Sequence, residues 1–305
     1  MSAILILEQS LNGLQFGLML FLLAAGLTLV FGIMDMINLA HGSLYMIGAF
    51  LAATLVQATG SFALGVVLAI PCAAIVGMLL EISILRTLYA RDHLSQVLAT
   101  FALILIINEA ARIIWGSDLP LAAPDALSGP VMLLPGMPYS AYRLLIIGIG
   151  LAVAVLLYFV VTRTRVGMLV RAGASNREMA LAMGVNIKRL FTLVFGFGAA
   201  LCAIAGAMLG PIFAVQVGMG ENILILAFVV IVIGGIGSIR GALIGSIVVG
   251  MVDTMGRAFL PALLKAFLTP SFASAIGPAL ASILIYVLMA GVLFWRPQGL
   301  FPARG

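Results

Sequence analysis

The sequence predicts an all-α fold, a polytopic bundle of about eight or nine transmembrane helices. Hydrophobic residues make up 64% of the 305 residues and charged residues only 8%, and the mean hydropathy is +1.29. One soluble core cannot bury so much apolar surface, so we expect the chain to reside in a lipid bilayer. Apolar runs long enough to cross about 30 Å of hydrocarbon recur, and the alternating pattern typical of membrane barrels is missing from the sequence.

The predicted helices follow the apolar runs. In order along the chain, these runs occupy residues 11–33, 44–57, 62–85, 95–115, 142–161, 192–214, 223–233, 242–252 and 276–295. Several are rich in Gly and Ala, the small residues that let membrane helices approach closely. In the fourth run, Glu109 and Arg112 are three residues apart, a spacing that lets them pair on one helical face. Polar links are predicted at residues 86–93, 216–222 and 253–274.

A proline-rich stretch, residues 116–141, separates the fourth run from the fifth. It is poor in charge, and its prolines are Pro120, Pro124, Pro130, Pro135 and Pro138. Because proline lacks a backbone donor and interrupts helices, we expect an extended external loop here.

Glycine and polar residues interrupt two of the apolar stretches. The first interruption, residues 32–43, includes Asp35, Asn38, His41, Gly42 and Ser43. The second, residues 234–241, has the sequence GGIGSIRG and includes Gly235, Gly237 and Ser238. Backbone groups freed at membrane depth must be satisfied by protein or water, so such breaks normally line a cavity. We therefore predict that these residues line a translocation pathway. The alternative is that the glycines only permit close packing and a kink.

Residues 162–191 form a charged segment between apolar runs, with the sequence TRTRVGMLVRAGASNREMALAMGVNIKRLF. Ser175 is predicted to cap a short helix, Glu178 to complete a capping box, and Gly184 to end the helix. A helix of about eight residues is unstable alone in water, so it must be held against something. It is either a connector packed on its own bundle or a contact for a soluble partner.

The basic residues predict the orientation. If residues 162–191 are cytoplasmic and the runs alternate, the other cytoplasmic basic residues are Arg86, Arg91, Arg240, Arg296 and Arg304. The external ones are then Arg112, Arg143, Arg257 and Lys265. This distribution follows the positive-inside rule and places the C-terminus in the cytoplasm. It leaves the side of the N-terminus open, because no Lys or Arg precedes Arg86.

Several other functions are disfavoured by the sequence. A phosphate-binding loop needs Gly before its Lys, but Lys188 and Lys265 follow Ile and Leu, so any ATP must be bound by a partner. The net charge of +5 has no soluble face on which nucleic acid could bind. His41 has no His or Cys near it in the sequence, so no metal site is predicted. An intramembrane hydrolase using Ser43 and His41 is disfavoured, because no oxyanion motif is visible.

Several motifs resemble those of ABC importer permeases for branched-chain, or hydrophobic, amino acids. Residues 178–184, EMALAMG, are similar to the Glu-Ala-Ala, three residues, Gly motif with which such permeases engage their ATPase subunits. Met179 replaces an alanine of that motif, and the downstream Ile and Leu-Pro are missing. The other similar motifs span nearly the whole chain in the family's order: NLAHG at 38–42, Arg171-Ala172 with Asn176, Ala180 and Gly184, residues 234–241, and RPQGLF at 296–301. The short chain is similar to the smaller, LivH-type permease.

The resemblance implies a single transmembrane permease domain, residues 1–305, in a bacterial inner membrane. The partners it implies are a second homologous permease, forming a heterodimer, two ABC ATPase subunits that bind ATP and Mg²⁺, and a periplasmic or lipid-anchored binding protein. This chain itself would need no cofactor. The ATPase contact it implies, together with the cap analysis above, comprises Arg171, Ala172, Ser175, Asn176, Glu178, Ala180 and Gly184.

Two alternatives remain for the function. Relatives in this family also carry urea or short amides, so the substrate could differ from a branched-chain amino acid. An ion-coupled secondary transporter or channel is the alternative from another class, since broken helices also suit ion coupling. Such a carrier has no need of a capped helix with the EMALAMG pattern.

Overall fold

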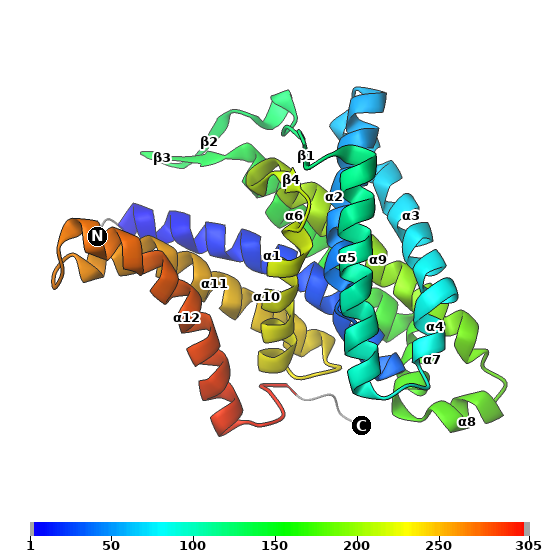
Figure 1. Cartoon of the computed structure of the whole chain (residues 1–305). Coiled ribbons are helices and arrows are strands. Elements are labelled where there is room, and N and C mark those ends of the chain that lie inside the picture. Colours follow the sequence, from blue (N-terminus) through cyan, green and yellow to red (C-terminus); the bar gives the residue numbers. More distant parts are fainter. Residues whose placement is uncertain (1–2, 302–305) are drawn as a thin grey trace. The chain divides into compact units, whose positions relative to one another are not determined.

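The computed structural model describes residues 3–301 and is helical over most of that length (Figure 1). The described residues form two compact units. The first unit comprises residues 3–21, 125–151 and 226–301, and the second comprises residues 22–124 and 152–225. The single permease domain over residues 1–305 stays a prediction, and Arg304 of the predicted cytoplasmic set lies outside the described residues.

Within residues 3–301, eight helices are long and apolar enough to cross a membrane, in agreement with the predicted number. They are α1 (Ala3–Met34), α2 (His41–Thr59), α3 (Phe62–Leu80) with its continuation to Leu88, α5 (His93–Trp115), α6 (Ala141–Arg163), α9 (Ile187–Phe213), α11 (Ile239–Leu264) and α12 (Pro270–Trp295). α10 (Met219–Gly234) is apolar but shorter, at 16 residues. Both predicted breaks are confirmed, since α1 and α2 are separated at residues 35–40, and α10 and α11 at residues 235–238.

The second unit is built around α2, α3 and α9, which lie side by side (Figure 1). Small residues allow the close approach of these helices. A Cβ atom at Gly48 of α2 would lie 2.3 Å from the Cα of Ala203 in α9, and one at Gly77 of α3 would lie 2.5 Å from the Ala199 side chain. A larger side chain at either glycine would push the helices apart. The small residues of the apolar runs therefore determine how closely α2, α3 and α9 pack.

Short segments complete the second unit. A π-helical turn, η1 (Glu81–Leu85), and α4 (Arg86–Leu88) continue α3, so the link predicted at residues 86–93 begins later than expected. The charged segment forms α7 (Arg165–Ser175) and α8 (Arg177–Ala182). Strands β1 (Asp118–Leu119) and β4 (Val215–Gln216) pair in antiparallel orientation.

The first unit pairs α11 with α12 in antiparallel orientation, Gly256 facing Ala281 and Gly277 facing Pro261. The proline-rich stretch forms η2 (Asp125–Leu127) and a hairpin of β2 (Pro130–Leu134) and β3 (Met137–Ser140). This agrees with the expected extended loop, although its external location stays a prediction.

The link predicted at residues 253–274 is wrong, because α11 continues as a helix to Leu264. Its charges are neutralised within the helix: Asp253 accepts a hydrogen bond from Arg257 Nε at 2.8 Å, four residues on. Arg257 also donates to Ser282 Oγ of α12 at 3.2 Å. Oppositely charged side chains four residues apart pair on one face of a helix, so these charges do not interrupt α11.

Candidate functional site

The charged segment contains the predicted short helix, α8, and a second helix, α7, that was not predicted. The Oδ1 atom of Asn176 accepts a hydrogen bond from the backbone N–H of Met179 at 2.8 Å and so caps α8. The prediction that Ser175 is the cap is wrong, because Ser175 is the last residue of α7. With the cap one residue later, Glu178 occupies the second helical position and the predicted capping box does not form.

Gly184 ends α8 as predicted. Its φ is +85°, in the left-handed region that glycine adopts without a steric penalty. The N–H of Val185 donates to the carbonyl of Ala180 at 3.0 Å, and the N–H of Gly184 to that of Leu181 at 2.9 Å. These two bonds satisfy carbonyls at the helix end in the manner of a Schellman motif.

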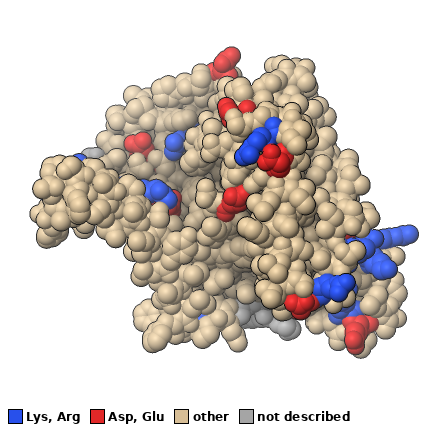
Figure 2. All heavy atoms as spheres, viewed as in Figure 1, with Lys and Arg blue, Asp and Glu red and all other residues tan. Residues whose placement is uncertain are grey.

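One residue anchors α8, and its other residues are exposed. Ala180 is buried, with 3% of its surface exposed, and holds the helix on the second unit. Met179, Leu181 and Met183 are 60%, 52% and 79% exposed. Charged side chains gather over the α7 and α8 end of the second unit, whereas broad areas of the same face carry none (Figure 2). α8 and its C-cap residue therefore carry uncovered apolar side chains next to charged ones, and Met179 and Met183 lie on the same side of the helix.

α7 is anchored on the same unit. A Cβ atom at Gly173 would lie 3.3 Å from Leu190 of α9 and 3.6 Å from Ile33 at the end of α1, so these elements are in close contact. Arg171 donates to the carbonyl of Val161, while Ala172 is exposed. The segment is thus both a packed connector and an exposed surface, and the two alternatives from the sequence are compatible.

At the first break, most of the predicted pathway residues are buried. Asp35 is exposed, with φ at +49°, but Asn38 and His41 are fully buried and Ser43 is 4% exposed. The side-chain oxygen of Asn38 accepts from the N–H of Ala40 at 3.0 Å, next to the start of α2. In this conformation these polar side chains belong to the interior of the second unit.

Gly42 provides close packing at this break. A Cβ atom there would lie 2.4 Å from the carbonyl oxygen of Gly220 at the start of α10. No side chain larger than hydrogen fits between the two backbones. This contact favours the packing explanation for Gly42, and the lining of a pathway by the first break stays a prediction.

The structure brings Cys202 of α9 to His41, a pairing that the sequence did not reveal. The Cys202 Sγ atom lies 3.1 Å from His41 Nε2, and both side chains are fully buried. The two residues are 161 positions apart, so only the packing of α2 on α9 could have revealed them. Among residues 3–301, no cluster of three or more metal-ligating side chains occurs.

At the second break, two motifs from distant parts of the sequence meet within the first unit. Gly235 and Gly237 have φ angles of +107° and +81°, and Ser238 Oγ caps α11 by accepting from the N–H of Gly241 at 3.1 Å. The backbone N–H groups of Leu300 and Phe301 donate to carbonyls at the end of α10, at 2.8 and 2.9 Å. The closing segment thus satisfies the orphan carbonyls of α10.

Glu81 lies at the centre of a polar cluster, which we call the Glu81 cluster: Glu81 and the partly exposed Arg86, Tyr89 and Thr192. The Glu81 side chain is fully buried. Its Oε1 accepts from Tyr89 Oη at 2.8 Å and Arg86 Nε at 3.2 Å, and its Oε2 accepts from Thr192 Oγ1 at 2.7 Å and Arg86 Nη2 at 2.9 Å. Burial, followed by the bond to Glu81, raises the pKa of the Tyr89 hydroxyl.

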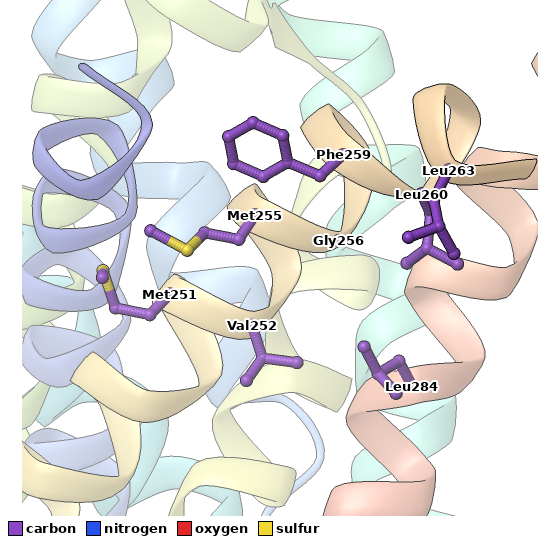
Figure 3. A pocket seen from close by; sticks show the side chains of 8 residues that line it. All are labelled: Met251, Val252, Met255, Gly256, Phe259, Leu260, Leu263 and Leu284. Carbon is purple, nitrogen blue, oxygen red and sulfur yellow. The ribbon is translucent and has the colours of Figure 1, made fainter. Parts of the chain in front are cut away.

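A groove of about 360 Å³ lies on the first unit, over α11 and α12 (Figure 3). Met251, Met255 and Phe259 of α11 and Leu284 of α12 are among the residues that line it, and all of these residues are apolar. Without a polar side chain the groove cannot hold the charged ends of a zwitterion. It is therefore no candidate for a complete amino acid site.

Comparison with known proteins gives a consistent result. Residues 9–293 match the family model described as "Branched-chain amino acid transport system / permease component". The chain is 31% identical to the high-affinity branched-chain amino acid transport system permease protein BraD of Pseudomonas aeruginosa, over 96% of this chain and 95% of BraD. It is 30% identical to the corresponding protein LivH of Escherichia coli K12, over 96% of both chains. A probable branched-chain amino acid transport permease, LivH of Methanocaldococcus jannaschii, is 27% identical over 79% of this chain.

No solved structure gives a significant match to the chain.

Proposed function

Because the chain belongs to the family of branched-chain amino acid transport system permease components, we propose that it is the membrane subunit of an ATP-driven importer. The family resemblance noted in the sequence is thereby confirmed, and the chain is a multi-pass membrane protein. The proposed cargo is a branched-chain or other hydrophobic amino acid. The proposed location is a bacterial inner membrane, with the α7–α8 segment and the C-terminus in the cytoplasm.

The proposed assembly contains a second homologous permease, two ABC ATPase subunits and a periplasmic or lipid-anchored binding protein. In this assembly the chain performs no catalysis, because the ATPase subunits bind ATP with Mg²⁺ and hydrolyse it. Discontinuous helices such as α1–α2 and α10–α11 are the elements from which transporters build a pathway. The buried first break would then have to open during the transport cycle.

The uncovered apolar side chains of α8 and its C-cap are the observation that supports this proposal most strongly. A short helix with one buried anchor, Ala180, and three exposed apolar side chains fits the helix-in-groove mode of recognition. Exposed apolar residues on a polar, water-facing segment have a cost unless a partner covers them. An ion-coupled carrier has no use for such a surface.

ATP dependence tests the proposal directly. The chain, reconstituted in vesicles with its cognate partner subunits, should accumulate labelled leucine only when ATP is supplied. Collapsing the proton and sodium gradients should leave this uptake unchanged. Uptake that persists without ATP and disappears with the gradients would instead establish a secondary transporter.

The substitution Met183→Glu should weaken binding of the ATPase subunits. Burying a neutral polar group without a partner costs roughly 1–3 kcal/mol and an ionised carboxylate costs more, so the affinity should fall about tenfold or more. The measurement is retention of the ATPase subunits on the purified permease, compared with the amount of folded permease in the membrane.

Met132→Glu provides the matched control. Met132 lies in β2 and is 67% exposed, close to the 79% of Met183, but it belongs to the proline-rich stretch predicted to be external. The Met132→Glu permease should retain the ATPase subunits as fully as the wild type. Equal retention by the two variants would rule out α8 as the docking element.

A further inference from the structure

The Glu81 cluster and α8 are joined through one aromatic residue, Phe191 of α9. The Tyr89 ring meets the Phe191 ring edge-on, with 5.3 Å between centroids and an interplanar angle of 86°. From α8, the guanidinium carbon of Arg177 lies 4.9 Å from the centroid of the same ring. The contacts therefore run without a gap from α8 through Phe191 and Tyr89 to Glu81, all within the second unit.

The strength of each of these contacts depends on the relative orientation of the two groups. A cation over an aromatic face and an edge-on ring pair both weaken when the partners tilt. The carboxylate of Glu81 is buried and accepts four hydrogen bonds. Moving it would break some of these bonds and leave buried polar atoms without partners, which costs free energy. Together these contacts favour one relative arrangement of α8, α9 and the η1 turn that continues α3.

The cluster also sits where α3 changes its winding. The N–H of Arg86 donates to the carbonyl of Glu81, five residues back, which is the π-helical pattern. This wider turn brings the side chains of Glu81 and Arg86 together, although they are five residues apart. π-helical turns and ionisable side chains inside membrane segments both occur preferentially at functional sites.

Through α9, the series of contacts that starts at α8 extends to the first break, between α1 and α2. α9 carries Phe191 and Thr192 at its start and Cys202 further along, beside His41 of α2. Because Gly48 and Ala203 hold α2 and α9 in backbone contact, a shift of α9 displaces α2 as well. A movement of α8 can thus be transmitted to the start of α2 through side chains that are in direct contact.

We propose that Arg177, Phe191, Tyr89 and Glu81 form a brace that transmits the movement of α8 to α3 and α9. The inference rests on the proposed function, because α8 is driven only if an ATPase docks there. Tyr89 and Glu81 are positioning residues in this scheme, and neither contacts the cargo. Without the brace, the ATPase subunits would hydrolyse ATP, but the movement of α8 would not reach α3 and α9, and transport would be uncoupled.

Two mild substitutions test the brace. Tyr89→Phe removes only the hydroxyl that donates to Glu81. Glu81→Gln keeps the size of the side chain, but it removes the charge and replaces one of the two accepting oxygens by an amide NH2 that only donates. Glu109→Gln is the control, because it removes a carboxylate from the exposed Glu109–Arg112 pair of α5, which bonds at 3.1 Å outside the brace. For each variant, hydrogen exchange of the α8 amides is measured on the permease alone, and labelled leucine taken up per ATP hydrolysed is measured on the complex.

Tyr89→Phe and Glu81→Gln should speed exchange in α8 by about tenfold and lower uptake per ATP by about tenfold, with the ATPase subunits still bound. Glu109→Gln should match the wild type in both measurements. Wild-type uptake per ATP in Tyr89→Phe would overturn the brace, as would unchanged exchange in both variants. If the wild-type complex shows no ATP-driven uptake, the proposed function fails, and the exchange measurement still decides whether Tyr89 and Glu81 hold α8.

Discussion

Replacing Gly48 with valine is expected to abolish accumulation of the folded chain. Even a single Cβ atom at Gly48 would lie 2.3 Å from the Cα of Ala203 and 2.7 Å from its Cβ. The obstacle on α9 is backbone, which cannot rotate away as a flexible side chain can. Overpacking by one methyl group costs roughly 1–3 kcal/mol, and valine adds two more carbons against a total stability of about 5–15 kcal/mol.

Gly291→Val supplies the matched comparison. Gly291 lies inside α12, and a Cβ atom there would meet nothing within 4 Å. The same substitution at this position should leave the amount of folded, membrane-extracted protein near that of the wild type, as judged by size-exclusion chromatography. Equal yields from the two variants would show that the close approach of α2 and α9 is not essential to the fold.

Much of this fold can be predicted from the sequence because the bilayer restricts the choices. Apolar runs must be helices in lipid, and glycine with polar neighbours marks where a helix cannot continue, as at residues 35–40 and 235–238. The main error was to end α11 at residue 252. Asp253 and Arg257 suggested a loop, but their mutual pairing and the Ser282 hydroxyl make them compatible with a helix.

The candidate site was only partly predictable, because its parts depend on contacts between distant residues. The end of α8 at Gly184 follows from local backbone preference and was predicted. The choice between Ser175 and Asn176 as cap was not, since both residue types cap helices and the length of α7 decides between them. Cys202 beside His41 and Thr192 beside Glu81 require the packing of α9 on its neighbours.

Arg86→Leu is expected to lower the amount of folded permease severely. The substitution removes both guanidinium bonds to Glu81, at 2.9 and 3.2 Å, and leaves a fully buried carboxylate without its counter-ion. Removing one partner of an ion pair is destabilising when the charge left behind is buried. Because Arg86 is itself 31% exposed, solvent offsets part of this loss.

The double variant Glu81→Leu with Arg86→Leu separates folding from coupling. Replacing both partners of a buried ion pair by apolar residues is often neutral or stabilising, so the folded yield should return close to the wild-type level. In the double variant the Tyr89 hydroxyl loses its acceptor Glu81, so uptake per ATP should be low although the protein folds. If the double variant instead regains full coupling, the cluster contributes only to folding, because the chain of contacts from α8 would then be dispensable for transport.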